Sequence, residues 1–179
     1  MLYIEAPNIH LEDEQPSLFL GGGITNCKDW HYTLVSEVKD FNVTIYNPRR
    51  KKFDMDDITQ SEIQIKWEFK HMNKADVLVF YFSEETLCPI TLFEFGSRMN
   101  SCIYRKLHGL KKQSILIYCE PGYKRKSDVE IQFNLLKIDL HEKINKCKSE
   151  LITPEYFDAH YFSEYNIFVE HLKNKLLSL

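Results

Sequence analysis

A chain of 179 residues fits one domain of ordinary size with a sizeable core and is too short for two substantial domains. Its composition, 44% hydrophobic and 27% charged, excludes extensive disorder, and its net charge of -3 argues against a surface that neutralises a nucleic-acid backbone. We therefore expect a single domain over residues 1–179, with an N-terminal extension over 1–16 and a C-terminal helix over 163–177.

The cysteines indicate a reducing compartment. They are odd in number and scattered, and they form neither a CxxC pair nor a Cys/His spacing suited to zinc, so we predict no metal site. The chain begins without a basic segment followed by an apolar one, and no window approaches the ~20 apolar residues of a membrane span. We expect a cytoplasmic protein that uses neither membrane nor nucleic acid as a partner.

The first third of the chain alternates between strand and helix patterns. Ser17–Leu20 is a short apolar run that ends in the glycines 21–23, and apolar residues then recur at helical spacing over 28–39. Asn42–Tyr46 is rich in β-branched and aromatic residues and is closed by Asn47-Pro48, which predicts a second strand.

The middle of the chain continues the alternation. Capping residues and apolar spacing predict a helix over 61–73, and the continuous apolar run Ala75–Phe82 is typical of a central parallel strand. Pro89 suits the first turn of a helix that we expect to run over 90–107, and Ser114–Cys119 is the next strand.

This alternation predicts the fold class. It is typical of an α/β three-layer sandwich with helices on both faces of a mainly parallel sheet, here of four to five strands. Such sheets bind ligands beyond the carboxyl ends of their strands. We therefore expect the loops after Leu20, Tyr46, Phe82 and Cys119 to line one crevice.

Three glycines and two ring-binding candidates follow the first strand. Gly21, Gly22 and Gly23 either let a ligand approach the backbone closely or form a tight turn, and their spacing is not that of a dinucleotide or triphosphate motif. Just beyond them, Asp29 and Trp30 could bind and stack on a ring, or simply cap and pack a helix.

The segment NPRRKKFDMDD joins a basic run to an acidic one. A solvated loop is the simpler interpretation, because mixed charge runs usually lie in water. Arg49 or Arg50, at the mouth of the crevice, could instead hold a phosphate or a base carbonyl through paired hydrogen bonds.

Two acidic residues are catalytic candidates. Glu94 lies between Phe93 and Phe95, about one turn into the helix after Pro89, where the helix N-terminus would favour an ionised carboxylate. An anionic carboxylate among apolar groups is what nucleophilic attack on a sugar carbon requires. Asp76 starts the central strand, so it either satisfies backbone donors there or lies beneath the crevice, although strand starts are normally far from it.

Six segments of the chain carry a resemblance to a known family. They are SLFLGGGITNCKDW, NPRR, QIKWE (Gln64 to Glu68), ADVLVFYF, CPITLFEFG and YKRKSDVEIQ. In this order they resemble the nucleoside 2-deoxyribosyltransferase-like family, the wider group that includes 2'-deoxynucleoside 5'-phosphate N-hydrolases. The resemblance implies a flavodoxin-like sheet, a Glu94 nucleophile followed by Gly96, and a substrate-positioning role for Asp76. It also implies a homo-oligomer whose active sites are completed by a neighbouring subunit, through Asp128 or Asn134.

Two positions depart from the family pattern. Where the transferases have a tyrosine that contacts the nucleophile, this chain has Phe19, and near the place of a base-contacting aspartate it has Cys88. The serine-rich phosphate-binding pattern of the hydrolases is not evident, although Ser97 and Arg98 follow Glu94. The resemblance implies a cofactor-free nucleoside 2-deoxyribosyltransferase, and leaves open an N-glycoside hydrolase of a nucleoside monophosphate or another riboside, or a non-catalytic nucleotide-binding module.

Overall fold

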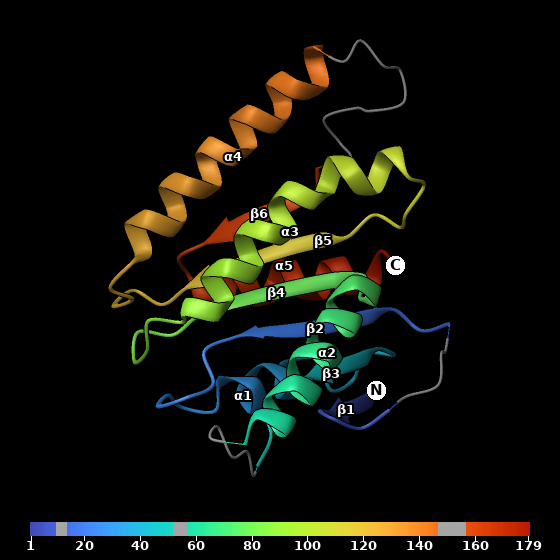
Figure 1. Ribbon diagram of the computed structural model, residues 1–179, viewed down its shortest axis with the longest axis vertical. Helices are drawn as coiled ribbons and strands as arrows, with labels where there is room; N and C mark the ends of the chain where they lie inside the picture. The colour runs from blue at the N-terminus through green and yellow to red at the C-terminus, as the bar shows by residue number, and fades with distance from the viewer. Residues whose placement is uncertain (10–13, 52–56, 147–156) are drawn as a thin grey trace.

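The computed structural model describes residues 1–9, 14–51, 57–146 and 157–179, and the structural statements below refer to them. The described strands form one parallel sheet of six, in the order β1-β3-β2-β4-β5-β6 (Figure 1). The strands are β1 Leu2–Glu5, β2 Ser17–Gly22, β3 Thr44–Asn47, β4 Val77–Phe82, β5 Ser114–Cys119 and β6 Ala159–Phe162. The helices are α1 Trp30–Glu37, α2 Ile58–Lys74, α3 Pro89–Leu107, α4 Lys126–Lys146 and α5 Tyr165–Leu177.

The predicted α/β sandwich is confirmed, with six strands instead of four to five. The additional strands are the two edges of the sheet: β1 comes from the predicted N-terminal extension, and β6 comes from a segment without a predicted strand. Both are four residues long and only partly buried, so neither has the continuous apolar run that identifies β4.

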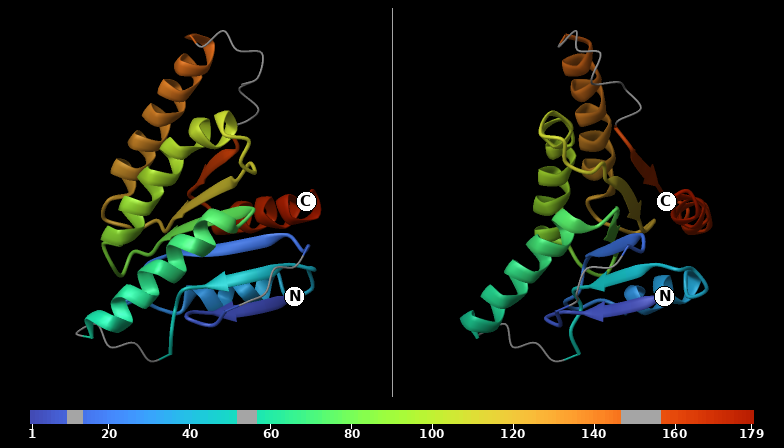
Figure 2. Two further views of the ribbon diagram at one scale, coloured as in Figure 1. Left: turned by 45° about the vertical axis from the view of Figure 1, so that its right-hand side comes forward. Right: turned by 90° about the vertical axis from the view of Figure 1, so that its right-hand side faces the viewer.

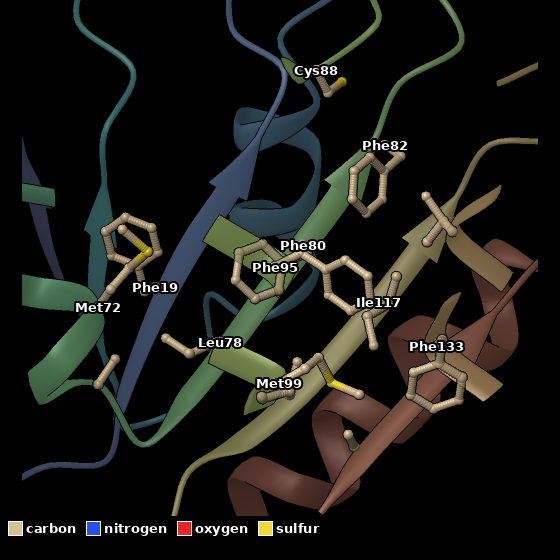
Figure 3. Close-up of a cluster of buried hydrophobic side chains, with 14 of the residues drawn as sticks. Phe19, Met72, Leu78, Phe80, Phe82, Cys88, Phe95, Met99, Ile117 and Phe133 are labelled. Atoms are coloured by element: carbon tan, nitrogen blue, oxygen red, sulfur yellow. The ribbon is translucent and has the colours of Figure 1, made fainter. Parts of the chain in front are cut away.

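Helices cover both faces of the sheet, as the edge-on view shows (Figure 2). One hydrophobic cluster packs α1 and α5 against one face, through residues such as Leu34 and Phe168. The other cluster packs α2, α3 and α4 against the opposite face, with Met72, Phe95 and Met99 among its buried side chains (Figure 3). The described part of the chain thus has two cores, one on each side of a buried sheet.

The order of the strands defines a switch point in the sheet. From β2 the chain passes through α1 to β3 on one side, and it then crosses by way of α2 to β4 on the other side of β2. Because the two connections leave in opposite directions, a crevice is expected above the carboxyl ends of β2 and β4.

No helix within the described ranges is both long enough and apolar enough to cross a membrane.

Candidate functional site

A cleft of about 750 Å³ opens at the switch point, between α2 and α3 and beyond the carboxyl ends of β2 and β4. Its position is the one predicted for a ligand site in this kind of sheet. The lining residues come from α2 (Ile65, Glu68, Phe69, Met72), from α3 (Pro89, Ile90, Thr91, Phe93, Glu94, Ser97, Arg98), and from β2 and the connecting segments (Phe19, 21–26, Pro48, Thr86, Cys88).

Helical spacing directs one side of α2 and one side of α3 into the cleft. On α2 the lining residues are 65, 68, 69 and 72, and on α3 they include 90, 93, 94 and 97. Both sets follow the i, i+3, i+4, i+7 pattern of a single helix face. Each helix thereby presents one glutamate, one phenylalanine and one isoleucine, so the cleft is mainly apolar and contains two carboxyl groups.

Glu94 is largely shielded from water. Its pKa is raised to about 8, mainly by burial and also by the nearby Glu68 carboxylate, while the Arg98 guanidinium partly opposes both effects. The prediction that the helix N-terminus keeps Glu94 ionised is therefore wrong for the ligand-free cleft. Glu94 is the sixth residue of α3, and the helix dipole acts mainly on the first turn.

Glu68 was not among the predicted site residues. Burial raises its pKa as well, while a hydrogen bond from Gln64 and the charge of Arg50 act in the opposite direction. Gln64 Nε2 donates to Glu68 Oε1 at 2.6 Å and to the carbonyl of Pro48 at 2.8 Å, which fixes the carboxyl group on its helix. The sequence signal was the Gln-x-x-x-Glu spacing, but only the packing of α2 beside α3 reveals what Glu68 faces.

The raised pKa of Glu94 predicts a stability that depends on pH. The carboxyl group ionises near 4.5 in the unfolded chain and near 8 in the folded one, so between these values unfolding releases a proton and the free energy of unfolding falls as pH rises. Glu94→Gln should remove this penalty and raise the free energy of unfolding by roughly 1–3 kcal/mol at pH 8 and by little at pH 4.5.

Chemical denaturation at both pH values measures the effect. Glu170→Gln, on the exposed side of α5, is the matched control and should change stability equally at both pH values. A Glu94→Gln gain that is the same at pH 4.5 and pH 8 would contradict a shielded carboxyl group.

Two of the glycines that line the cleft, Gly22 and Gly23, occupy positions where a larger residue would not fit. A Cβ atom on Gly23 would lie 2.5 Å from Thr86 Cγ2 and 2.8 Å from Cys88 Sγ. A Cβ atom on Gly22 would lie 2.6 Å from the carbonyl oxygen of Tyr81 and would also overlap the Trp30 ring. The glycine segment therefore packs closely and forms part of the cleft wall, and its contact with a ligand stays a prediction.

Gly22→Ala is expected to lower the free energy of unfolding by roughly 2–4 kcal/mol, because the Tyr81 carbonyl belongs to the neighbouring strand and cannot move aside. Gly96→Ala is the matched control: nothing lies within 4 Å of its Cβ position, and alanine favours helix, so it should stabilise by roughly 0.5–1 kcal/mol. Thermal unfolding measures both, and equal effects would contradict the packing at Gly22.

Asp29 and Trp30 do not line the cleft. Trp30 is 2% exposed and stacks on Tyr81 with ring centroids 4.3 Å apart, in the core on the other face of the sheet. Its Nε1 donates to the Gly23 carbonyl at 2.8 Å. Asp29 caps α1 by accepting from the backbone N–H of Tyr32. For both residues the structure supports the capping and packing interpretation.

The two arginines act near the cleft without lining it. Arg49 donates to the carbonyls of Cys27 and Lys28 at 3.0 and 2.9 Å, which fastens the loop before α1. Arg50 contributes through its charge, which favours the ionised form of Glu68. Cys88 does line the cleft, and burial raises the pKa of its thiol to about 11, so the thiol stays protonated.

The structure does not bring Asp76 or Asp128 to the cleft. Asp76 lies just before β4, at the amino ends of the strands and away from the cleft. There its carboxylate accepts hydrogen bonds from the backbone N–H and the hydroxyl group of Ser17 at 2.9 and 2.8 Å. It also pairs with Lys111. These contacts correct the catalytic assignment of Asp76, because its carboxyl group ties two strand starts together. Asp128 is exposed on α4 and pairs with Arg125.

Comparison with known proteins identifies the family of the chain. A family model described as nucleoside 2-deoxyribosyltransferase like matches residues 15–113, which is more than half of the chain and includes both Glu68 and Glu94. A search of the curated proteins found no match. The matched region contains β2, β3, β4 and both helices that form the cleft, so the chain belongs to the nucleoside 2-deoxyribosyltransferase-like family.

Proposed function

We propose that the protein cleaves the N-glycosidic bond of a (deoxy)nucleoside and transfers the sugar to a second base. One observation carries the proposal: two carboxyl groups on neighbouring helices face one apolar cleft at the switch point of the sheet. A pair of carboxyl groups is what glycosyl transfer with a covalent intermediate uses, one as the nucleophile and the other as the acid and base.

In the first step a carboxylate oxygen of Glu94 attacks C1' of the sugar. A C1'–O bond forms as the C1'–N bond breaks, and the electron pair of the broken bond leaves with the base. Glu94 has a raised pKa and therefore holds a proton in much of the ligand-free protein at pH 7. We infer that Glu68, whose orientation Gln64 fixes, accepts this proton and delivers it to the departing base.

In the second step the glycosyl ester reacts with an acceptor. Glu68, now ionised, removes the N–H proton of a second base, whose nitrogen attacks C1' and releases the Glu94 carboxylate. If water takes the place of the base, the same steps give hydrolysis. Phe19 lines the cleft without a hydroxyl group and Cys88 stands near the place of a base-contacting acid, so neither position supplies a carboxylate or hydroxyl group that would favour a base over water as the acceptor.

Chromatography of a substrate panel tests the proposal. The protein is incubated with deoxynucleosides, ribonucleosides, their 5'-monophosphates and a nicotinamide nucleotide, each with and without a free acceptor base. Exchange of bases is the expected result. Free base alone would indicate a hydrolase, and binding without turnover would overturn the enzymatic proposal and favour a nucleotide-binding module.

We also propose that the protein assembles as a homo-oligomer through α4. Ile131, Leu135 and Ile138 are more than half exposed, and Asp128 lies at the same 3-4-3 spacing. Large apolar residues at this spacing form a seam suited to another helix, and the same helix of a second copy is self-complementary. In this arrangement Asp128 would face the partner. Sedimentation velocity should show an oligomer that Leu135→Glu dissociates, and a monomeric wild type would overturn the proposal.

A further inference from the structure

We propose that the base of the substrate is held between Phe69 of α2 and Phe93 of α3, at the mouth of the cleft. This inference rests on the proposed function, which it deepens by assigning the part of the site that recognises the base. Phe69 lies outside the sequence segments that suggested the chemistry of the bond, and Phe93 lies within one of them only as the neighbour of Glu94.

The exposure of these side chains is the first argument. Phe69 and Phe93 are 64% and 77% exposed, and Ile65 and Ile90 beside them are similarly exposed. Leaving four large apolar side chains in water at one opening is unfavourable, since burying each would gain free energy. A contiguous apolar patch with polar groups at its rim marks a binding surface.

The depth of the residues in the cleft is the second argument. Phe69 follows Glu68 in the sequence and Phe93 precedes Glu94, so each ring stands beside one carboxyl group on its helix. The glutamates are partly buried while the rings are exposed. A nucleoside whose C1' lies at the carboxyl groups would therefore extend its base outward, between the two rings.

One of the rings is held in place before a ligand arrives. The guanidinium of Arg98, on α3, lies 5.6 Å from the centroid of the Phe69 ring on α2. Arg98 itself is buried and donates to Asn73 Oδ1 at 2.7 Å, so its position is fixed. A guanidinium over one side of the ring restricts its motion, which lowers the entropy that a stacked base must overcome.

Stacking on phenylalanine predicts a tolerant base site. Every nucleobase has a flat π face, and stacking depends on the area of the ring more than on its hydrogen-bonding edge. We therefore expect purines to bind more tightly than pyrimidines, and several bases of each class to be accepted.

Calorimetric titration with free adenine, hypoxanthine and thymine tests the inference. Phe69→Leu and Phe93→Leu keep an apolar side chain but remove the ring, and each should weaken purine binding by roughly tenfold. Phe93→Tyr keeps the ring and should bind purines within about twofold of the wild type. With a nucleoside substrate, the leucine variants should raise KM in proportion and leave kcat nearly unchanged, because the rings do not touch the breaking bond.

The outcomes separate this inference from the proposed function. Ring-dependent binding of bases by a protein without turnover would support the base site and overturn the enzymatic proposal. Turnover whose KM and kcat the leucine variants leave unchanged would support the enzymatic proposal and overturn the base site. If these variants bind bases like the wild type but sediment as a different species, the rings belong to a subunit contact and the inference fails.

Discussion

Glu94→Gln is expected to abolish base release, lowering kcat/KM by at least ~10³-fold while the protein stays folded. The amide has the shape of the carboxyl group but cannot supply an anionic oxygen to C1'. Loss of the carboxylate does not empty the core, since Glu94 lines the cleft and the hydrophobic core residues of α3, Phe95 and Met99, do not. Release of base, followed by chromatography, measures the effect.

The covalent intermediate gives an independent readout. Wild-type protein quenched with acid during turnover should gain the mass of one glycosyl group at Glu94, and Glu94→Gln should gain none. Glu170→Gln is the matched control for loss of a carboxylate and should keep full activity. Turnover persisting in Glu94→Gln would remove Glu94 as the nucleophile.

Glu68→Gln is expected to reduce kcat/KM by roughly 10²–10⁴-fold and to change the shape of the pH profile. In the proposed mechanism the active form of the wild type holds one proton on the pair of carboxyl groups of Glu68 and Glu94. Activity should therefore fall above about pH 8, where Glu94 loses that proton and both groups are ionised. In the variant the charge that helps to raise the pKa of Glu94 is gone. Residual activity should then rise with pH to a plateau that begins below pH 8.

The change of profile distinguishes a proton carrier from a residue that merely supports the helix. Glu62→Gln, on the exposed side of the same helix, removes a carboxylate that pairs with Lys66 and should keep both the rate and the profile of the wild type. A Glu68→Gln protein that is slower but keeps the loss of activity above pH 8 would contradict the proposed proton transfer.

Local sequence patterns predicted those strands and helices whose own residues are apolar enough to show that they are buried. The residues of β4 are apolar on both faces, which indicates a central strand. The edge strands β1 and β6 are short and partly exposed, and their pairing depends on strands elsewhere in the chain. Glu94 stood out because its flanking phenylalanines made a carboxylate unexpected. Trp30 could not be placed by its sequence, since an aromatic ring after a glycine turn packs equally well in a core or on a ligand.

Glu68 shows what sequence reasoning could not reach. Its role depends on α2 lying beside α3, which follows from the order of the strands and from no feature near residue 68. Asp76 is the converse case. Its segment matched the family, but its position before β4 puts it at the end of the strand that is far from the cleft.

The two glutamates stand on helices that share one hydrophobic cluster with Met72, Phe95 and Met99 (Figure 3). Their separation is therefore set by interlocking side chains in the interior, and not by the connecting segments around the opening. On the proposed function, insertions or exchanges in the loops before α1 and α3 would alter which molecules enter the cleft without moving the two carboxyl groups. The substrate could then change while the arrangement of groups that carries out the reaction stays the same.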